Sequence, residues 1–271
     1  MNYNKYFLSI FIIFLSGCVT YDDQGNEVIE YNENAKMDWK LEKIAPLQDY
    51  DEEELKIPII FAGLPANPPD SYSIPDFPEP GDQGRQPGGS AWALSYAVSY
   101  LYRQEPSYRC SPAFIYNILN GNRNRGIDLK EGLLLVQKVG CASYPLMPFN
   151  QNDHITQPGP TAYKDAAKHK VKGFARVDFN DFQQIRGMLL KQQPIVILMI
   201  VTENFLKHDE DIWTPDGNSA GFHGLIITGY NSTDMTLTLQ NSAGKKWGRN
   251  GTTTIPFSWL VRLTKKAYVI Y

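Results

Sequence analysis

The pattern of apolar and polar positions gives the first half of the folded chain helical periodicity. Ser90 precedes a long apolar run, so it is expected to be the N-cap of a buried helix. Ser111-Pro112 supplies a cap and a first-turn proline, and Asp128 with Glu131 forms a capping-box pattern. These signals predict helices over 91–102, from Pro112 to Gly121, over 129–139, over 163–170 and from Asn180 to Lys191.

The second half of the chain changes to short segments rich in β-branched residues, which is typical of strands. They predict strands over 194–201, 224–230, 235–240, 252–255 and 267–271. Helices followed by strands indicate an α+β body with a helical half and a β half. The cleft between two such halves is where a binding site is expected.

The first eighteen residues predict a secreted, lipid-anchored protein. Lys5 gives a positive start, and the apolar stretch 6–15 is too short to span a bilayer as a helix. It ends in Leu15-Ser16-Gly17-Cys18, which resembles a bacterial lipobox whose cysteine becomes acylated. A plain secretory signal that happens to end near a cysteine is the alternative. Val19, rather than Asp, follows Cys18, which resembles lipoproteins sent to the outer membrane.

Charge separates a tail from a body. Residues 19–56 contain twelve acidic residues against four lysines, whereas 57–271 contain seventeen acids against twenty-one bases. We therefore divide the chain into a signal peptide (1–17), a lipidated Cys18 with an acidic, solvated tether (18–56) and one folded domain (57–271). The formal net charge of -3 gives no indication of nucleic-acid binding.

Two cysteines remain if Cys18 carries lipid. Cys110 and Cys141 would then lie in an oxidising compartment, where an even pair suggests a disulfide. Two buried thiols are the alternative, because the sequence gives no distance between them.

Three segments far apart in the chain carry candidate chemistry. Gln83 lies in a glycine-rich turn before the first long helix, His223 begins an apolar strand, and Asn241 follows a later strand. Each segment alone is weak evidence for a catalytic site, because a histidine on an apolar strand is usually a core residue. Together they match a thiol protease, in which a cysteine at a helix N-terminus is activated by a histidine that an amide orients. A further amide donor, often a glutamine, stabilises the oxyanion.

The trio and its surroundings resemble the bacterial branch of the papain family of cysteine peptidases. The resemblance rests on a D-Q-G turn at 82–84, an H-x-x-x-x-x-G-Y strand from His223, and an N-S-x-G-x-x-W-G-x-x-G loop from Asn241. The segments 111–116 and 140–145 also resemble the family. It implies a two-lobed fold with an N-terminal helical lobe, a C-terminal antiparallel β lobe and a cleft between them. It also implies that Gln83 is the oxyanion-hole glutamine, His223 the base and Asn241 its orienting group, with Trp247 in the asparagine loop.

The chain departs from that pattern at two positions. The family's cysteine lies six residues after the oxyanion-hole glutamine, and this position is Gly89. If Trp92 is aligned with the tryptophan that follows the cysteine, the position becomes Ala91, at the expense of a two-residue insertion. Neither residue is a thiol. Ala243 stands where the family usually has a tryptophan that shields the asparagine–histidine hydrogen bond.

Three functions follow as hypotheses. The first is a pseudopeptidase whose cleft binds a peptide or protein partner at the cell envelope. The second is weak hydrolysis with the Ser90 hydroxyl as nucleophile, helped by His223 and Asn241, although Ser90 as a simple helix cap is the plainer interpretation. The third is a structural lipoprotein whose cleft is plugged, for example by Phe205 and Trp213.

Other features predict no cofactor or metal. The sequence has no zinc-ligand spacing, P-loop or dinucleotide fingerprint. The run His208-Asp209-Glu210-Asp211 is expected to be a solvated acidic loop, and His154 and His169 are expected at the surface.

Overall fold

The computed structural model describes residues 20–21, 27–28 and 51–271. Strands β1 (Thr20–Tyr21) and β2 (Glu27–Val28) pair antiparallel in a first compact unit, Met1–Asn32. The rest of the description belongs to a second unit, Glu33–Tyr271. The predicted signal peptide and Cys18 lie outside the described residues. Within the described residues, no helix has the length and apolar character that crossing a membrane requires.

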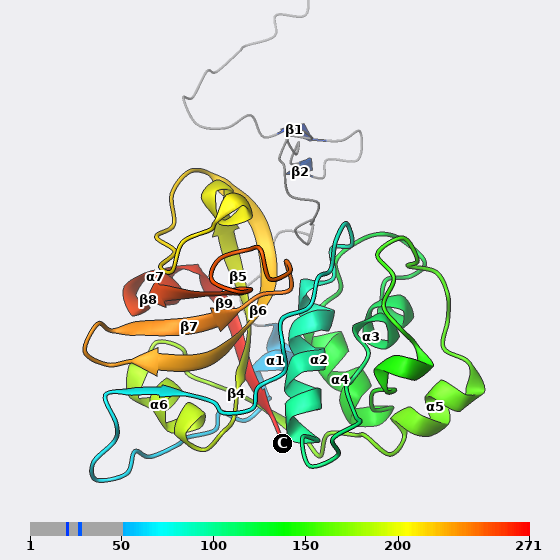
Figure 1. Cartoon of the computed structure of the whole chain (residues 1–271), viewed down its shortest axis with the longest axis horizontal. Coiled ribbons are helices and arrows are strands. Elements are labelled where there is room, and N and C mark those ends of the chain that lie inside the picture. Colours follow the sequence, from blue (N-terminus) through cyan, green and yellow to red (C-terminus); the bar gives the residue numbers. More distant parts are fainter. Residues whose placement is uncertain (1–19, 22–26, 29–50) are drawn as a thin grey trace, which may run out of the picture. The chain divides into compact units, whose positions relative to one another are not determined.

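The helical lobe of the second unit contains α2 (Gly89–Leu101), α3 (Pro112–Leu119), α4 (Leu129–Lys138) and α5 (Pro160–Ala166), seen together in Figure 1. Two predicted caps are confirmed. The Ser111 side chain accepts the backbone N–H of Phe114, and the Asp128 side chain accepts that of Glu131. The predicted fourth helix starts three residues early, at a first-turn proline.

The N-cap prediction for Ser90 is wrong. Helix α2 begins at Gly89, its N-cap is Gly88, and no side chain bonds to this cap. Ser90 lies inside the first turn and is fully buried. Every residue from Gly89 to Tyr100 is buried, and α2 packs against both α3 and β6. The helix therefore lies between the two lobes, and its N-terminus is where both lobes meet.

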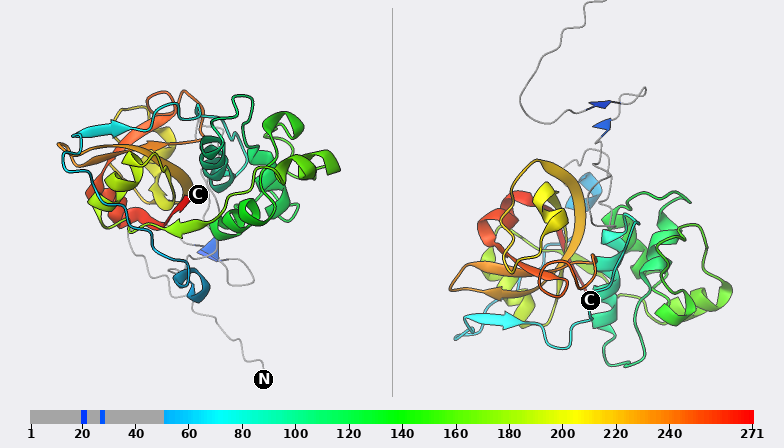
Figure 2. Two further views of the ribbon diagram at one scale, coloured as in Figure 1. Left: turned by 90° about the horizontal axis from the view of Figure 1, so that it is seen from below. Right: turned by 45° about the horizontal axis from the view of Figure 1, so that its top comes forward.

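The sheet lobe is built on one antiparallel sheet of seven strands in the order β4-β9-β5-β6-β7-β8, with β3 also paired to β6. Figure 2 shows helices and sheet side by side from two further directions. All five predicted strands are confirmed, and the fold is α+β as predicted. The strands are β3 (Ser71–Ser73), β4 (Phe174–Arg176), β5 (Ile195–Thr202), β6 (Ser219–Asn231), β7 (Thr236–Gln240), β8 (Thr252–Pro256) and β9 (Thr264–Ile270).

Four further helical elements of the second unit pack around the two lobes' main elements or lie in their loops. Helix α6 (Phe182–Leu190) matches the predicted fifth helix and is capped by Asp181, whose side chain accepts from the N–H groups of Gln183 and Gln184. Helix α7 (Phe257–Leu263) and the 3-10 helices η1 (Tyr144–Leu146) and η2 (Glu203–Lys207) were not predicted. They are short, and pattern alone rarely reveals such elements.

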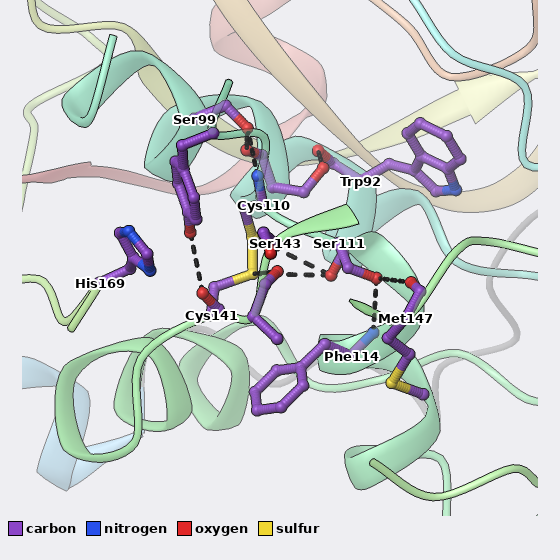
Figure 3. Close-up of a disulfide and its surroundings, with 12 residues drawn as sticks. Trp92, Ser99, Cys110, Ser111, Phe114, Cys141, Ser143, Met147 and His169 are labelled. Carbon is purple, nitrogen blue, oxygen red and sulfur yellow. Dashed lines mark hydrogen bonds between the residues drawn. A yellow bond between two sulfur atoms is a disulfide. The ribbon is translucent and has the colours of Figure 1, made fainter. Parts of the chain in front are cut away.

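A disulfide joins Cys110 to Cys141, as one of the two alternatives predicted (Figure 3). It links the entry of α3 to the segment after α4, across 31 positions. The N–H of Cys110 donates to the Ser99 hydroxyl at 2.9 Å, and the Tyr108 hydroxyl donates to the Cys141 carbonyl at 2.9 Å. The helical lobe is therefore cross-linked around its buried centre.

Part of the predicted acidic tether belongs to the folded body, because the acidic run at 51–54 is ordered and partly buried. It forms the short helix α1 (Glu52–Leu55), with Asp51 and Glu54 in a complete capping box. Glu54 is only 1 % exposed, and its carboxylate accepts from Lys266 at 2.7 Å and from the Tyr268 hydroxyl at 2.7 Å. Asp51 also pairs with Lys130 of α4 at 2.8 Å. The prediction missed this because the partners come from the other end of the chain.

Candidate functional site

The four positions singled out by sequence converge where the lobes meet. Gln83 lies in the turn before α2, Gly89 opens α2, His223 lies on β6, and Asn241 follows β7. Gln83 and His223 are fully buried and Asn241 is 1 % exposed. The structure therefore brings together the predicted histidine, asparagine and glutamine, beside a glycine.

His223 and Asn241 form a short hydrogen bond, with 2.7 Å between His223 Nε2 and Asn241 Oδ1. Asn241 Oδ1 also accepts the backbone N–H of Ser242 at 2.7 Å. Because a backbone N–H can only donate, the amide oxygen must face both groups, so Nε2 of the imidazole carries the proton. The arrangement is that of an asparagine orienting a neutral histidine.

Burial lowers the pKa of His223 to about 4, because the charged imidazolium loses its hydration, while the hydrogen bond to Asn241 opposes the shift. The imidazole is therefore neutral at pH 7. Its Nδ1 atom is then the basic nitrogen, and this atom faces Gly89.

Gly89 is the residue that faces the imidazole. A Cβ atom built on Gly89 would lie 2.6 Å from both Nδ1 and Cε1 of His223, and 3.1 Å from the backbone nitrogen of Gly224. The 2.6 Å distances are too short for real carbon contacts and the 3.1 Å distance is tight, so the ring occupies space that a side chain at Gly89 would need. Ala91 lies two positions along the helix, about 200° around its axis, and so points away from the imidazole.

The turn that carries Gln83 is fastened to the loop that carries Asn241. The N–H of Gln83 donates to the Ser242 carbonyl at 2.7 Å, and the Ser242 hydroxyl donates to Gln83 Oε1 at 2.6 Å. Gln83 Nε2 donates to the Gln86 carbonyl at 2.9 Å. Tyr96 of α2 adds a third link, since its hydroxyl accepts from the N–H of Gly81 and donates to the Asn241 carbonyl. Sequence reasoning quoted Ser242 only as part of the asparagine-loop motif and gave it no role, and it missed Tyr96, which belongs to no motif.

Aromatic rings pack behind the histidine. The Phe205 ring centroid lies 5.9 Å from that of His223, 4.7 Å from that of Trp247 and 4.5 Å from that of Trp213. Phe205, Trp213 and Trp247 are fully buried, and Trp247 Nε1 donates to the Phe205 carbonyl at 2.8 Å. With Ala243 in the asparagine loop, Phe205 supplies an apolar ring against the imidazole.

A surface pocket of about 520 Å³ opens beside the asparagine loop. Gln83, Gly89, His223 and Asn241 are not among its lining residues. It is lined by Phe77, Pro78, Glu79, Pro80, Gln240, Lys245, Arg249, Asn250 and Thr252.

Two of the other histidines, His169 and His208, differ from expectation. His169 was predicted at the surface but is 5 % exposed, with its ring stacked 3.8 Å from that of Tyr108 (Figure 3 places it beside the disulfide). His208 is also buried, and Nε2 of its ring lies 2.7 Å from the Thr253 hydroxyl, although its acidic neighbours are exposed. His154 is partly exposed. In the described part of the chain, no group of three or more His, Cys, Asp or Glu residues could hold a metal.

Comparison with known families agrees with this geometry. The model described as "Papain family cysteine protease" matches residues 120–260, which is more than half of the chain. This chain belongs to the papain family. The matched range contains His223 and Asn241 but not the turn with Gln83 and Gly89, so the resemblance to papain-family sequences is strongest outside the nucleophile turn.

Similar papain-family proteins support the fold. An uncharacterized peptidase C1-like protein of Acanthamoeba polyphaga mimivirus is 26% identical over 200 residues, 66% of this chain and 64% of that protein. Xylellain, a cysteine protease from Xylella fastidiosa, superposes with a TM-score of 0.72 at 20% identity, covering 89% of this chain and 98% of xylellain. A procathepsin B from Trypanosoma congolense gives 0.65 at 13% identity, covering 93% and 92%. At these identities the two solved structures establish the fold alone.

A side chain at Gly89 is expected to destabilise the protein. Gly89→Ala should lower the free energy of unfolding by about 1–3 kcal/mol, because its Cβ must displace the imidazole or the β6 backbone. Gly88→Ala is the matched control, since its Cβ would meet Tyr116 and Trp92 at ordinary distances of 3.5 and 3.7 Å. Urea unfolding of both variants measures the difference. Equal effects would mean that His223 does not occupy this space.

Gly89→Cys is expected to be as unstable as Gly89→Ala and to gain no efficient peptidase activity. The Cβ that carries the sulfur would lie 2.6 Å from the imidazole, so the ring must move from the position in which it bonds to Asn241. A fluorogenic peptide assay, with thiol labelling to show that the new cysteine is reactive, tests this expectation. Efficient turnover by this single variant would contradict it.

Proposed function

We propose that this papain-family chain is a lipid-anchored pseudopeptidase of the bacterial cell envelope, held at the outer membrane through Cys18. It binds a peptide or protein partner in the cleft between its lobes and does not hydrolyse it. The observation that carries the proposal is Gly89, which faces His223 without a side chain while the imidazole takes the space.

The chemistry that remains supports binding rather than turnover. A papain-type reaction needs a thiolate next to the imidazole, and the described residues contain cysteine only in the Cys110–Cys141 disulfide. Loss of the nucleophile from a triad enzyme lowers turnover on the order of 10⁶-fold. His223 and Asn241 still hold β6 and the asparagine loop of the sheet lobe together. The bonds of Ser242 to Gln83 and of Tyr96 to Asn241 connect that loop to the turn before α2 and to α2 itself.

The envelope location rests on the lipobox-like sequence Leu15-Ser16-Gly17-Cys18. Several acyl chains on one cysteine would hold the protein stably, because each buried methylene contributes to membrane affinity. Intact-mass measurement of the purified chain, before and after lipase or alkali treatment, tests for the acyl groups.

A peptidase assay tests the loss of catalysis. We expect no hydrolysis of fluorogenic peptides above the buffer rate, and no difference between the wild type, Ser90→Ala and His223→Ala. Hydrolysis by the wild type that both substitutions abolish would overturn the proposal and support the serine-dependent alternative.

A binding assay tests the partner role. Labelled peptides from a random library, measured by fluorescence anisotropy with the intact chain, are expected to yield binders that are recovered uncleaved. Complete absence of binders would favour the structural alternative with a plugged cleft, for which the buried Phe205 and Trp213 are the relevant residues.

A further inference from the structure

An unusual apolar segment follows α1. The thirteen residues from Ile57 to Pro69 contain no charged side chain. Three large apolar residues at or near its start are exposed to solvent: Leu55 by 57%, Ile59 by 42% and Phe61 by 68%. We call these three side chains the outward strip.

The outward direction of Ile59 and Phe61 is set by sheet geometry. Ile59 pairs with Arg176 in a parallel bridge at the edge of the sheet, and the N–H of Ile60 donates to the Arg176 carbonyl at 3.0 Å. In an extended chain, alternate residues face opposite sides. Ala62 is buried against Gly187, where a Cβ would collide with the Ala62 backbone, so Ile59 and Phe61 face the other way. A solvated sheet face normally carries polar residues, whereas Ile59 and Phe61 are apolar and exposed beside Arg176.

The strip is held by a rigid backbone. Arg176 donates from Nε to the Ile57 carbonyl at 3.0 Å and from Nη2 to the Leu55 carbonyl at 3.1 Å. The N–H of Ala62 donates to Gln184 Oε1 at 2.9 Å, and Glu54 is buried just before Leu55. Because the backbone is already ordered, contact through these side chains would need little further loss of conformational entropy.

We propose that the outward strip is a membrane-contact face, which rests on the bilayer that holds the lipid anchor. This inference depends on the anchor in the proposed function. Cys18 lies 33 positions before Asp51, so the chain between them spans at most about 120 Å. The strip lies where that chain joins the body, so anchoring keeps this face at a high local concentration of lipid.

The chemistry of the strip indicates how it would bind. Three of the four acidic residues just before it form ion pairs, Glu53 with Lys56, Asp51 with Lys130 and Glu54 with Lys266, and Glu52 is the fourth. The strip itself is uncharged, so contact arises from burial of apolar side chains at the lipid interface and not from attraction to anionic headgroups. Binding to neutral lipids is therefore expected to be insensitive to salt.

A site-specific label tests the proposal on the full, lipid-anchored chain. Cys18 is acylated under the proposal and Cys110 is bonded to Cys141, so Phe61→Cys introduces a unique thiol for a fluorophore. Ile155→Cys, at a residue 59% exposed in the helical lobe, is the matched control. In vesicles of phosphatidylethanolamine with brominated phosphatidylcholine, we expect quenching at 61 to exceed quenching at 155 on the order of threefold, at low and high salt alike. Adding Ile59→Asp should remove the difference, whereas adding Met235→Asp should not.

Three outcomes of the labelling experiment would overturn the proposal. Equal quenching at both labels, or strong quenching of the label at 61 by aqueous iodide, places the strip in water. Protection from both quenchers places it against protein, either another segment of this chain or a second molecule. A chain that fails to float with vesicles shows that the anchor is absent. Vesicles added to that unanchored chain then test the strip alone, and equal quenching at both labels overturns it.

Discussion

Glu54→Gln is expected to lower the free energy of unfolding by about 3–5 kcal/mol. Lys266 is 5% exposed, and both of its hydrogen bonds to Glu54, at 2.7 and 2.8 Å, involve a carboxylate that is 1% exposed. Removing only the negative charge leaves a buried ammonium group without a counter-ion. Tyr268 also loses the carboxylate that accepts the hydrogen bond from its hydroxyl group. Equilibrium unfolding in urea measures the effect.

Two controls separate the effect of the buried ion pair from the effect of removing any acidic side chain of α1. Glu53→Gln removes the neighbouring carboxylate of the same helix, whose ion pair with Lys56 is 69% exposed on both sides, and should cost less than about 1 kcal/mol. Glu54→Leu combined with Lys266→Met removes both charges and should recover much of the loss. If Glu54→Gln costs no more than Glu53→Gln, α1 does not pack on β9.

Lowering the pH from about 6.5 to about 4 is expected to cost about 3 kcal/mol of stability through His223 alone. The pKa of this imidazole falls from 6.5 to about 4 in the folded protein, because burial disfavours its charged form. Between these values the unfolded chain binds one more proton than the folded chain, so stability falls as the pH falls. The loss is complete below the folded pKa.

His223→Gln provides the comparison for this effect. Urea unfolding at several pH values between 4 and 7 should show a steeper decline for the wild type than for the variant, with the gap approaching about 3 kcal/mol. The variant starts from lower stability at pH 7, but only the slope matters. Parallel profiles would show that folding does not lower the pKa of this imidazole.

Features set by neighbouring residues were predictable from sequence. The caps at Ser111 and Asp128 depend on residues three positions away, and the strands β5 to β9 have long enough β-branched runs to be recognised. Ser90 failed as a cap because Gly88 takes that position, which lets α2 start earlier and buries the hydroxyl. Strand β4 has only three residues and is defined by pairing with β9, about ninety positions later.

The sequence was enough to predict which residues form the candidate site, but not how their side chains pack together. Resemblance identified His223, Asn241 and Gln83, which the fold brings together. That the imidazole fills the space at Gly89 depends on how β6 approaches α2, which no local pattern encodes. His169 was misassigned for the same reason, because its stacking partner Tyr108 and its hydrogen-bond partner Glu105 lie more than sixty positions away.

The position of β9 also constrains the order of folding. This C-terminal strand lies between β4 and β5, and it is the strand with which β4 pairs. Its Lys266 and Tyr268 also complete the burial of Glu54 near the start of the body. The body therefore cannot complete its sheet or seat α1 until β9 has been synthesised. A ribosome-stalled chain that ends at Leu263, before β9, should remain open to protease at both ends of the body.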